Sequence, residues 1–324
     1  MAEHKATGIG SIDLGVRDLE KSRAFYAQVW GLKEVSRENG SIYMRATGHD
    51  HHVLGLHQKP RSYLMSINLA APDLTTVDAL HANAKGLGAT IVSAPANLPK
   101  VAGGGYGFSL KAPDGQLITI SAEVARNAAL PRDTSVPERL SHVVLNAHRY
   151  DEQIAFFRDV LGFRLADTTD FMDFMRCCSD HHSIALARAE GPSLNHMAYE
   201  MPDIEGLMKG AGRMKQNGFD IGWGIGRHGP GDNVFSYFVE PNGFVTEYTT
   251  GMEQVVDDNY EWHGPDYWAT AFMRPCRWGL AMKPSDWVRK AMHGIEVEER
   301  NRRCEEVIAE GLKQGLGHQA GSPA

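Results

Sequence analysis

The chain has 324 residues, a formal net charge of −7 and a sequence pI near 6.1. This length favours about two domains of ~100–150 residues, and the charge comes without a basic stripe, which argues against a nucleic-acid partner. The first residues carry no apolar core with a small-residue cleavage site, and no run approaches ~18 apolar residues, so we expect a cytoplasmic protein with no membrane partner.

The first half of the chain contains three strand signals. Residues 11–32 predict an alternating strand, a polar turn and a helix. Residues 66–74 predict a strand followed by Pro-Asp and a helix, and residues 112–121 predict a hairpin turn that enters a strand.

The second half repeats these signals in the same order, in residues 141–163, 196–204 and 240–249. The offsets between corresponding positions are nearly constant: 142 − 11 = 131, 196 − 66 = 130 and 247 − 119 = 128. Chance similarity does not keep three anchors in step, so the repeat predicts two domains of similar fold. We place them at residues 1–130 and 131–260, followed by a C-terminal tail at residues 261–324.

Within each half, the order of a strand, a helix and further strands occurs twice. This predicts an α+β fold of four βαβββ modules whose strands form two cups. Three positions distinguish the halves, because His142, His196 and Glu247 stand where the first half has Ser11, Ser66 and Thr119. One histidine on a strand is more often a hydrogen-bonded core residue than a ligand. Two imidazoles and a carboxylate that converge in one cup are instead typical of a non-haem Fe(II) site with open positions for substrate and oxygen.

These features resemble the vicinal oxygen chelate superfamily, and within it the two-domain type I extradiol ring-cleavage dioxygenases. The resemblance covers about residues 8–260. Its most specific part is residues 226–247, where His228, Tyr237, Glu240-Pro241, Gly243 and Glu247 match the family signature in register.

The resemblance implies a metal-free N-terminal domain and a C-terminal domain that binds Fe(II), occasionally Mn(II), through His142, His196 and Glu247. It implies that His182 is the acid-base histidine and that His228 and Tyr237 hydrogen-bond the substrate oxygen. The implied reaction cleaves a catechol ring with O2 beside the vicinal hydroxyls, as a step of aromatic hydrocarbon catabolism, in a homo-oligomeric enzyme. The first half also has a histidine pair, with His52 fourteen residues before Ser66, so the pair alone does not indicate catalysis.

The residues near the predicted site favour an uncharged, hydrophobic catechol. Val144, two residues after the first ligand, is apolar as in the biphenyl-type branch of the family. Other candidate pocket residues are bulky and apolar, although they could simply fill the cup: Phe171, Met172, Phe174, Met175, Trp223 and Phe235. Asp232 lies one position out of register with an acidic residue of some relatives, and we assign it no role.

The tail predicts a helix from about Ser285 to Leu312, with Ser285 as its cap. Its apolar positions are Val288, Met292, Ile295, Val307 and Ile308. The four cysteines, Cys177, Cys178, Cys276 and Cys304, are too few for a disulfide framework. Cys177 and Cys178 are neighbours in the sequence, which is poor geometry for a zinc pair, so we expect buried thiols there.

Two other functions fit the same scaffold. A glyoxalase-like metal-dependent isomerase usually recruits more ligands and consumes no oxygen, and His228 with Tyr237 argues against it. A non-catalytic small-molecule-binding protein typically lacks a metal triad, and the retention of His142, His196 and Glu247 argues against that alternative.

Overall fold

The computed structural model describes residues 4–131, 133–256, 259–270 and 275–297. The first half contains, in chain order, β1 (Gly8–Val16), α1 (Leu19–Ala24), the π-helical turn η1 (Phe25–Trp30), β2 (Lys33–Glu38), β3 (Ser41–Arg45), β4 (Leu54–Gln58), β5 (Tyr63–Ala70), α2 (Leu74–Gly86), β6 (Thr90–Asn97), the short turn η2 (Lys100–Ala102), β7 (Tyr106–Lys111) and β8 (Leu117–Ala122). The order is strand, helix and three strands, twice, as the repeat predicts.

The second half has the same order and then two short helices: β9 (Arg139–Ala147), α3 (Tyr150–Ala155), η3 (Phe156–Val160), β10 (Arg164–Thr168), β11 (Met172–Arg176), β12 (Ile184–Arg188), β13 (Ser193–Glu200), α4 (Ile204–Gln216), β14 (Trp223–Arg227), β15 (Val234–Val239), β16 (Val245–Thr250), α5 (Pro265–Thr270) and α6 (Asp286–Met292). The prediction of four βαβββ modules is therefore confirmed.

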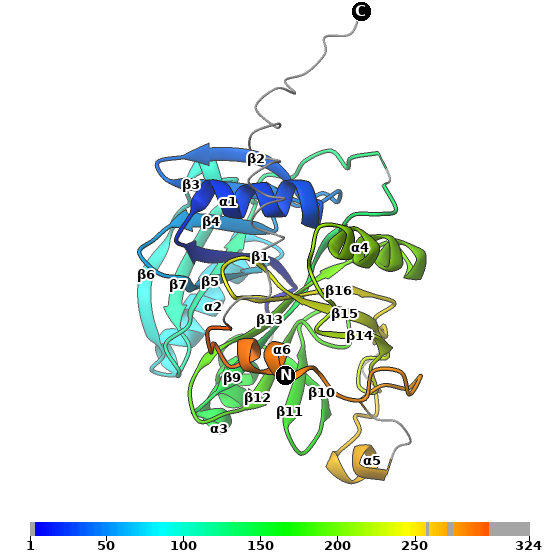
Figure 1. Cartoon of the computed structure of the whole chain (residues 1–324). Coiled ribbons are helices and arrows are strands. Elements are labelled where there is room, and N and C mark those ends of the chain that lie inside the picture. Colours follow the sequence, from blue (N-terminus) through cyan, green and yellow to red (C-terminus); the bar gives the residue numbers. More distant parts are fainter. Residues whose placement is uncertain (1–3, 132, 257–258, 271–274, 298–324) are drawn as a thin grey trace, which may run out of the picture.

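Each half forms one mixed eight-stranded sheet, and the two sheets have the same strand order. The orders are β2-β3-β4-β1-β5-β8-β7-β6 and β10-β11-β12-β9-β13-β16-β15-β14. Figure 1 shows the first sheet in blue to cyan and the second in green to yellow. In both sheets, the first strands of the two modules pair with each other at the sheet centre. In the second sheet these strands are β9 and β13, and β16 pairs with β13 on its other side.

The local sequence explains how each module turns from strand to helix and back. In both Pro-Asp motifs the aspartate caps the following helix: Asp73 accepts a hydrogen bond from the backbone N–H of Thr76, and Asp203 from that of Gly206, each at 2.7 Å. The turn before β16 places Gly243 at φ +89°, a conformation that favours glycine. This turn sets the register that carries Glu247 on β16.

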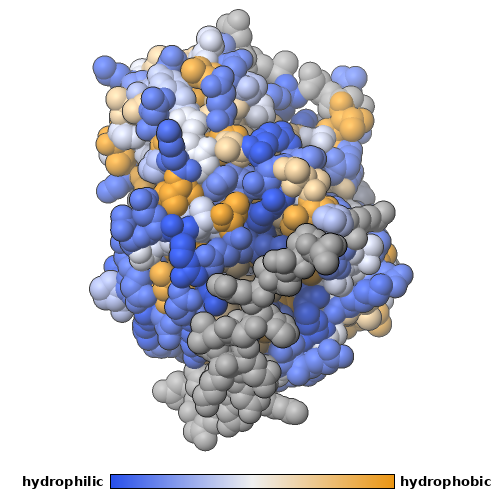
Figure 2. Space-filling view, turned by 90° about the horizontal axis from the view of Figure 1, so that it is seen from above, coloured by the Kyte–Doolittle hydropathy of each residue, from blue (hydrophilic) through white to orange (hydrophobic). Residues whose placement is uncertain are grey.

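The two halves share one hydrophobic core. Trp30 of η1 stacks on Tyr248 of β16, with ring centroids 3.7 Å apart and planes 8° apart, and the Tyr248 hydroxyl donates to the Trp30 carbonyl at 2.7 Å. The first half thus supports the strand that carries Glu247. The face seen in Figure 2 is mostly hydrophilic with scattered hydrophobic residues, as is usual for a protein surface.

The C-terminal segment differs from the expectation. The helix begins after Ser285 but ends at Met292, and Gly294 then takes a positive φ of +69°, which is typical of a helix end. The Ser285 side chain makes no capping hydrogen bond. Val288 and Met292 are buried, Ile295 is exposed, and Val307 and Ile308 lie outside the described residues. α6 packs against β13, β15 and β16.

Two further expectations concern membranes and thiols. None of the described helices combines the length and apolar character that a membrane crossing by a helix requires. Cys177 and Cys276 are buried free thiols, Cys178 is a partly buried one, and Cys304 lies outside the described residues.

Candidate metal centre

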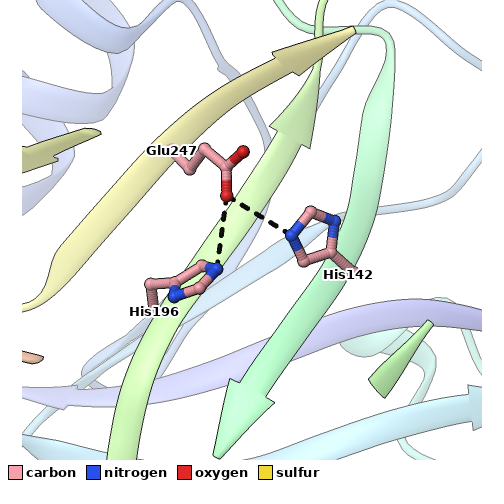
Figure 3. Close-up of side chains that lie close together, drawn as sticks. All are labelled: His142, His196 and Glu247. Carbon is pink, nitrogen blue, oxygen red and sulfur yellow. Dashed lines mark ion pairs between the residues drawn. The ribbon is translucent and has the colours of Figure 1, made fainter. Parts of the chain in front are cut away.

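Three adjacent strands bring His142, His196 and Glu247 together at the centre of the second sheet. Figure 3 shows His142 on β9, His196 on β13 and Glu247 on β16, with the two rings turned toward one carboxylate oxygen. Glu247 Oε2 lies 3.3 Å from His142 Nε2 and 3.2 Å from His196 Nε2. All three side chains are buried, and one ligand atom from each lies within 4.8 Å of the others.

Hydrogen bonds on the far side of each group fix this orientation. His196 Nδ1 lies 2.8 Å from the amide oxygen of Asn195, so it carries the proton and leaves the Nε2 lone pair facing Glu247. His142 Nδ1 lies 3.2 Å from the Ser141 hydroxyl. Asn233 Nδ2 lies 3.4 Å from Glu247 Oε1 and leaves Oε2 for the histidines.

The donor set fits a divalent metal. His196 Nε2 and Glu247 Oε2 are buried without a hydrogen-bond partner, which is costly unless a cation lies between them. One ligand atom from each residue lies within 4.8 Å of the other two, close enough for the three to share one ion. Burial alone would raise the pKa of Glu247, but the two imidazoles outweigh it and lower the pKa below its usual value. Burial lowers the pKa of His196, so both groups favour their metal-binding forms.

The structure also brings the three other predicted residues to this centre. The His182 ring centroid lies 4.4 Å from that of His142, and burial, with the neighbouring imidazoles, holds the pKa of His182 well below its usual value. His228 Nε2 lies 3.0 Å from the Tyr237 hydroxyl. Burial lowers the pKa of His228 to about 4 and raises that of Tyr237, so this pair is neutral near pH 7.

A pocket of about 280 Å³ opens onto these residues. Its remaining walls are mostly apolar, and no lysine, arginine or carboxylate lies among the described residues that form them: Val144, Thr169, Phe171, Met172, Phe174, Asn195, Trp223, Pro230, Pro275 and Met292. Two expected pocket residues lie elsewhere. Met175 is in the core, and Phe235 stacks behind His228 with ring centroids 3.8 Å apart.

Several residues of the site were missed in the sequence. Asn195 and Asn233 orient metal-site side chains, and Pro275 and Met292 come from the C-terminal segment. Asn195 directly precedes a predicted ligand, which is the only signal that could have identified it. Asp232, to which no role was assigned, pairs with Arg227 and Arg277 and thereby ties its loop to the C-terminal segment.

The corresponding cup of the first half contains a hydrogen-bonded network in place of these ligands. Asp13 and Asn68 occupy the positions of Val144 and Ala198 in the aligned strands. Asp13 accepts from Ser66 and Asn68, each at 2.7 Å, and lies 3.0 Å from His57 Nε2, while Asn68 also donates to Ser11 at 2.8 Å. These polar groups therefore satisfy one another's hydrogen bonds.

Replacing Asp13 by asparagine should lower the free energy of unfolding at pH 7 by about 2 kcal/mol. Burial raises the pKa of Asp13, but hydrogen bonds and the nearby histidines outweigh it and lower the pKa from 3.8 to about 2, and each unit is worth about 1.4 kcal/mol. Because the folded pKa is the lower one, this stabilisation is present above about pH 4 and disappears as the pH falls to about 2. Urea titrations of the wild type and Asp13→Asn at pH 7 and pH 3 measure this stabilisation. If the two proteins differ in free energy of unfolding by the same amount at both pH values, the lowered pKa of Asp13 is contradicted.

A family model places the chain among known proteins. The Glyoxalase/Bleomycin resistance protein/Dioxygenase superfamily model matches residues 8–120 and 139–248, which together make up more than half of the chain. A solved structure described as the Mn(II)-bound glyoxalase from Novosphingobium aromaticivorans is 39% identical, with 91% of this chain and 96% of that chain covered and a TM-score of 0.82.

Two curated proteins are also similar to the chain. Metapyrocatechase 2 of Cupriavidus necator is 34% identical over 147 residues, which are 40% of this chain and 46% of that protein. The match therefore spans a little under half of that relative's length. The manganese-dependent 2,3-dihydroxybiphenyl 1,2-dioxygenase of Geobacillus genomosp. 3 is 23% identical, with 79% of this chain and 93% of that protein covered.

Proposed function

The chain belongs to the Glyoxalase/Bleomycin resistance protein/Dioxygenase superfamily, and from this premise we propose that it is an Fe(II)-dependent extradiol dioxygenase. Its substrate is an uncharged catechol, whose ring is cleaved beside the vicinal hydroxyls with both atoms of O2 entering the product. The observation that carries the proposal is the convergence of His196 Nε2, His142 Nε2 and Glu247 Oε2 in one buried centre beside an apolar pocket.

Iron is the preferred metal because two histidines and one carboxylate with open positions are typical of non-haem Fe(II) oxygenases. Mn(II) is the second candidate, since one relative is named as manganese-dependent and one related structure as Mn(II)-bound. Among the described residues, the centre has three histidine or carboxylate ligands. The other positions of an octahedral ion would therefore remain for exogenous ligands.

Bound iron would supply open positions at which a vicinal diol and O2 meet in one coordination sphere. His182, held neutral by burial and neighbouring imidazoles, can accept the proton of a substrate hydroxyl and later return it. The Tyr237 hydroxyl and His228 form a neutral hydrogen-bonded pair at the pocket, where they can steady the substrate oxygen. The apolar walls exclude water and orient the ring, so the reacting groups meet in one geometry.

The pocket supports an uncharged substrate. Its described lining offers no cation to pair with a substrate carboxylate, and burying an unpaired charge is strongly unfavourable. The volume of about 280 Å³ lies just below the usual range of ~300–1,000 Å³ for small-molecule pockets. These properties favour a small hydrophobic catechol, and its ring cleavage would be a step of aromatic hydrocarbon catabolism.

Oxygen uptake with a panel of catechols tests the proposal. The purified protein, reconstituted with Fe(II) under argon, should consume O2 and form a yellow ring-fission product with alkyl- or aryl-substituted catechols. Catechols that carry a carboxylate should give a kcat/KM at least about tenfold lower. Metal analysis of the protein as isolated tests iron against manganese, and no uptake across the panel with either metal would refute the proposal.

A glyoxalase-like isomerase is the second candidate, because the related structure at 39% identity is described as a glyoxalase. The neutral His228–Tyr237 pair and the group of three ligands among the described residues argue against it. An isomerase would convert its substrate with no oxygen consumption. Assays of the hemithioacetal of methylglyoxal and glutathione, run beside the catechol panel, therefore distinguish the two activities.

Two further expectations join the proposal. The family resemblance favours a homo-oligomer, and the sequence favours a cytoplasmic location. Light scattering of the purified protein and fractionation of cells that express the full chain test them.

A further inference from the structure

A second histidine and an aspartate lie behind His182, on the side away from the pocket. His182 Nδ1 lies 3.1 Å from Nδ1 of His181, and His181 Nε2 lies 3.0 Å from Oδ2 of Asp167. All three side chains are buried, with 3%, 0% and 1% of their residue surface exposed. The hydrogen-bonded series Asp167–His181–His182 therefore connects strand β10 to the edge of the pocket.

The contacts of Asp167 set the direction of the hydrogen bonds between Asp167, His181 and His182. Its Oδ1 accepts from the backbone N–H of His263 at 2.6 Å, which leaves Oδ2 for His181. A carboxylate only accepts hydrogen bonds, so His181 carries a proton on Nε2 and, as a neutral ring, a lone pair on Nδ1. Since the two Nδ1 atoms face each other, His182 must then be the donor and carry its proton on Nδ1.

The reverse direction requires a less favourable arrangement. It needs a protonated Asp167, or a doubly protonated His181 with no exposed surface and another imidazole 3.1 Å away. Burying a charged ring costs its hydration, and the first direction avoids this cost while keeping the same contact between His181 and Asp167. With the first direction, the lone pair of His182 is on Nε2, the nitrogen that remains for the pocket.

The repeat provides an internal comparison. The first half has the same histidine pair, with His51 Nδ1 3.1 Å from His52 Nδ1. Ser36 occupies the equivalent position to Asp167 in the first half. Both residues come directly after a register shift in their strand, and they pair with equivalent residues of the neighbouring strand, Asp167 with Phe174 and Ser36 with Tyr43. Ser36 donates to the Val101 carbonyl instead. The aspartate is thus present in the half that has the metal ligands and absent from the half that lacks them.

We propose that Asp167 and His181 are positioning residues that hold His182 in the tautomer with its proton on Nδ1 and its lone pair on Nε2. In this form His182 is ready to accept the proton of a substrate hydroxyl. The catalytic meaning of the tautomer rests on the proposed dioxygenase function, but the tautomer itself can be measured independently of any activity.

The variant Asp167→Asn should reverse the tautomer. Its amide oxygen can keep the bond to the His263 N–H, which leaves the NH2 group to donate to His181 Nε2. His181 then carries its proton on Nδ1 and donates to His182, which must carry its proton on Nε2. Long-range ¹H–¹⁵N spectra of ¹⁵N-histidine protein, loaded with diamagnetic Zn(II) and assigned with His182→Asn, report which nitrogen is protonated.

The spectra should show His182 protonated on Nδ1 in the wild type and on Nε2 in Asp167→Asn. His181→Phe, which removes the acceptor but keeps a ring among Phe174 and Tyr260, should show both tautomers. This second variant keeps the test decisive if Asp167→Asn does not fold. A wild-type His182 protonated on Nε2, or a tautomer unchanged in both variants, would overturn the proposal.

Kinetics give the second readout. Asp167→Asn should lower kcat by roughly 10²-fold, at the low end of the 10²–10⁴ typical of general acid–base catalysis, with unchanged KM and metal content. Ser36→Asn introduces an asparagine at the equivalent position of the first half and should leave kcat and the tautomer of His182 unchanged. Equal kcat in Asp167→Asn and the wild type would overturn the positioning role. If the tautomer reverses but no catechol is turned over by the wild type, the proposed function fails and the tautomer assignment stands.

Discussion

His196→Ala should lose most of its bound metal and, with it, catechol turnover. The substitution removes the Nε2 donor that lies 3.2 Å from Glu247 Oε2, and the two remaining ligands cannot hold one face of the ion. Loss of an outer hydrogen-bond partner of a ligand already costs 10–100-fold in metal affinity, so we expect a loss of at least about 100-fold. Elemental analysis after gel filtration and Fe(II) titration followed by competition with a chelator measure the change.

Ser66→Ala is the matched control, because Ser66 occupies the same position of the repeat in the first half. It removes one hydrogen bond to Asp13 and should leave the metal content and turnover unchanged, with only a modest loss of stability. Circular dichroism of both variants checks the fold. A His196→Ala protein that keeps stoichiometric, tightly bound metal would show that His142, His196 and Glu247 are not the ligand set.

The repeat explains why the centre of the fold was predictable. Alternating strands at a nearly constant offset require two equivalent sheets, and pairing of β9 with β13 and of β13 with β16 then brings the three ligand strands together. Comparing the halves position by position separates the candidate ligands from ordinary core residues, because Ser11, Ser66 and Thr119 lie at the equivalent strand positions of the first half. The same comparison contrasts Asp167 with Ser36, so the repeat also contained the signal for the proposed positioning role of Asp167.

The C-terminal segment was less predictable because it has no counterpart in the repeat. The apolar spacing that predicted a helix from about Ser285 to Leu312 also fits a short helix that buries Val288 and Met292 and ends before Gly294. That Met292 lines the pocket depends on tertiary packing of α6 against β13, β15 and β16, and Pro275 lines it from the segment before α6. Asn146 fixes this packing by donating to the Met292 carbonyl at 2.6 Å, a contact between residues 146 positions apart that no local pattern indicates.

His182→Asn should retain its metal and lose turnover by 10²–10⁴-fold, the range that general acid–base catalysis typically contributes. The Asn amide can still reach His181 from the position of Nδ1, but it has no group in place of Nε2 to accept the substrate proton. Metal content should stay at the wild-type level because His182 lies beside the ligand His142 and is not one of the three converging groups. Single-turnover measurements under anaerobic mixing separate catechol binding, which should persist, from the later proton transfers.

His52→Asn, the equivalent change in the first half, is the control that distinguishes catalysis from a structural effect of the histidine pair. His52 has a neighbouring histidine, as His182 has, at the same Nδ1–Nδ1 distance of 3.1 Å. It faces the hydrogen-bonded network around Asp13 instead of the candidate metal ligands. If the pair mattered only for folding, the two variants would lose similar stability and similar activity. Full activity in His52→Asn together with loss in His182→Asn would therefore assign the proton transfer to the second cup, whereas normal turnover in His182→Asn would remove this residue from the mechanism.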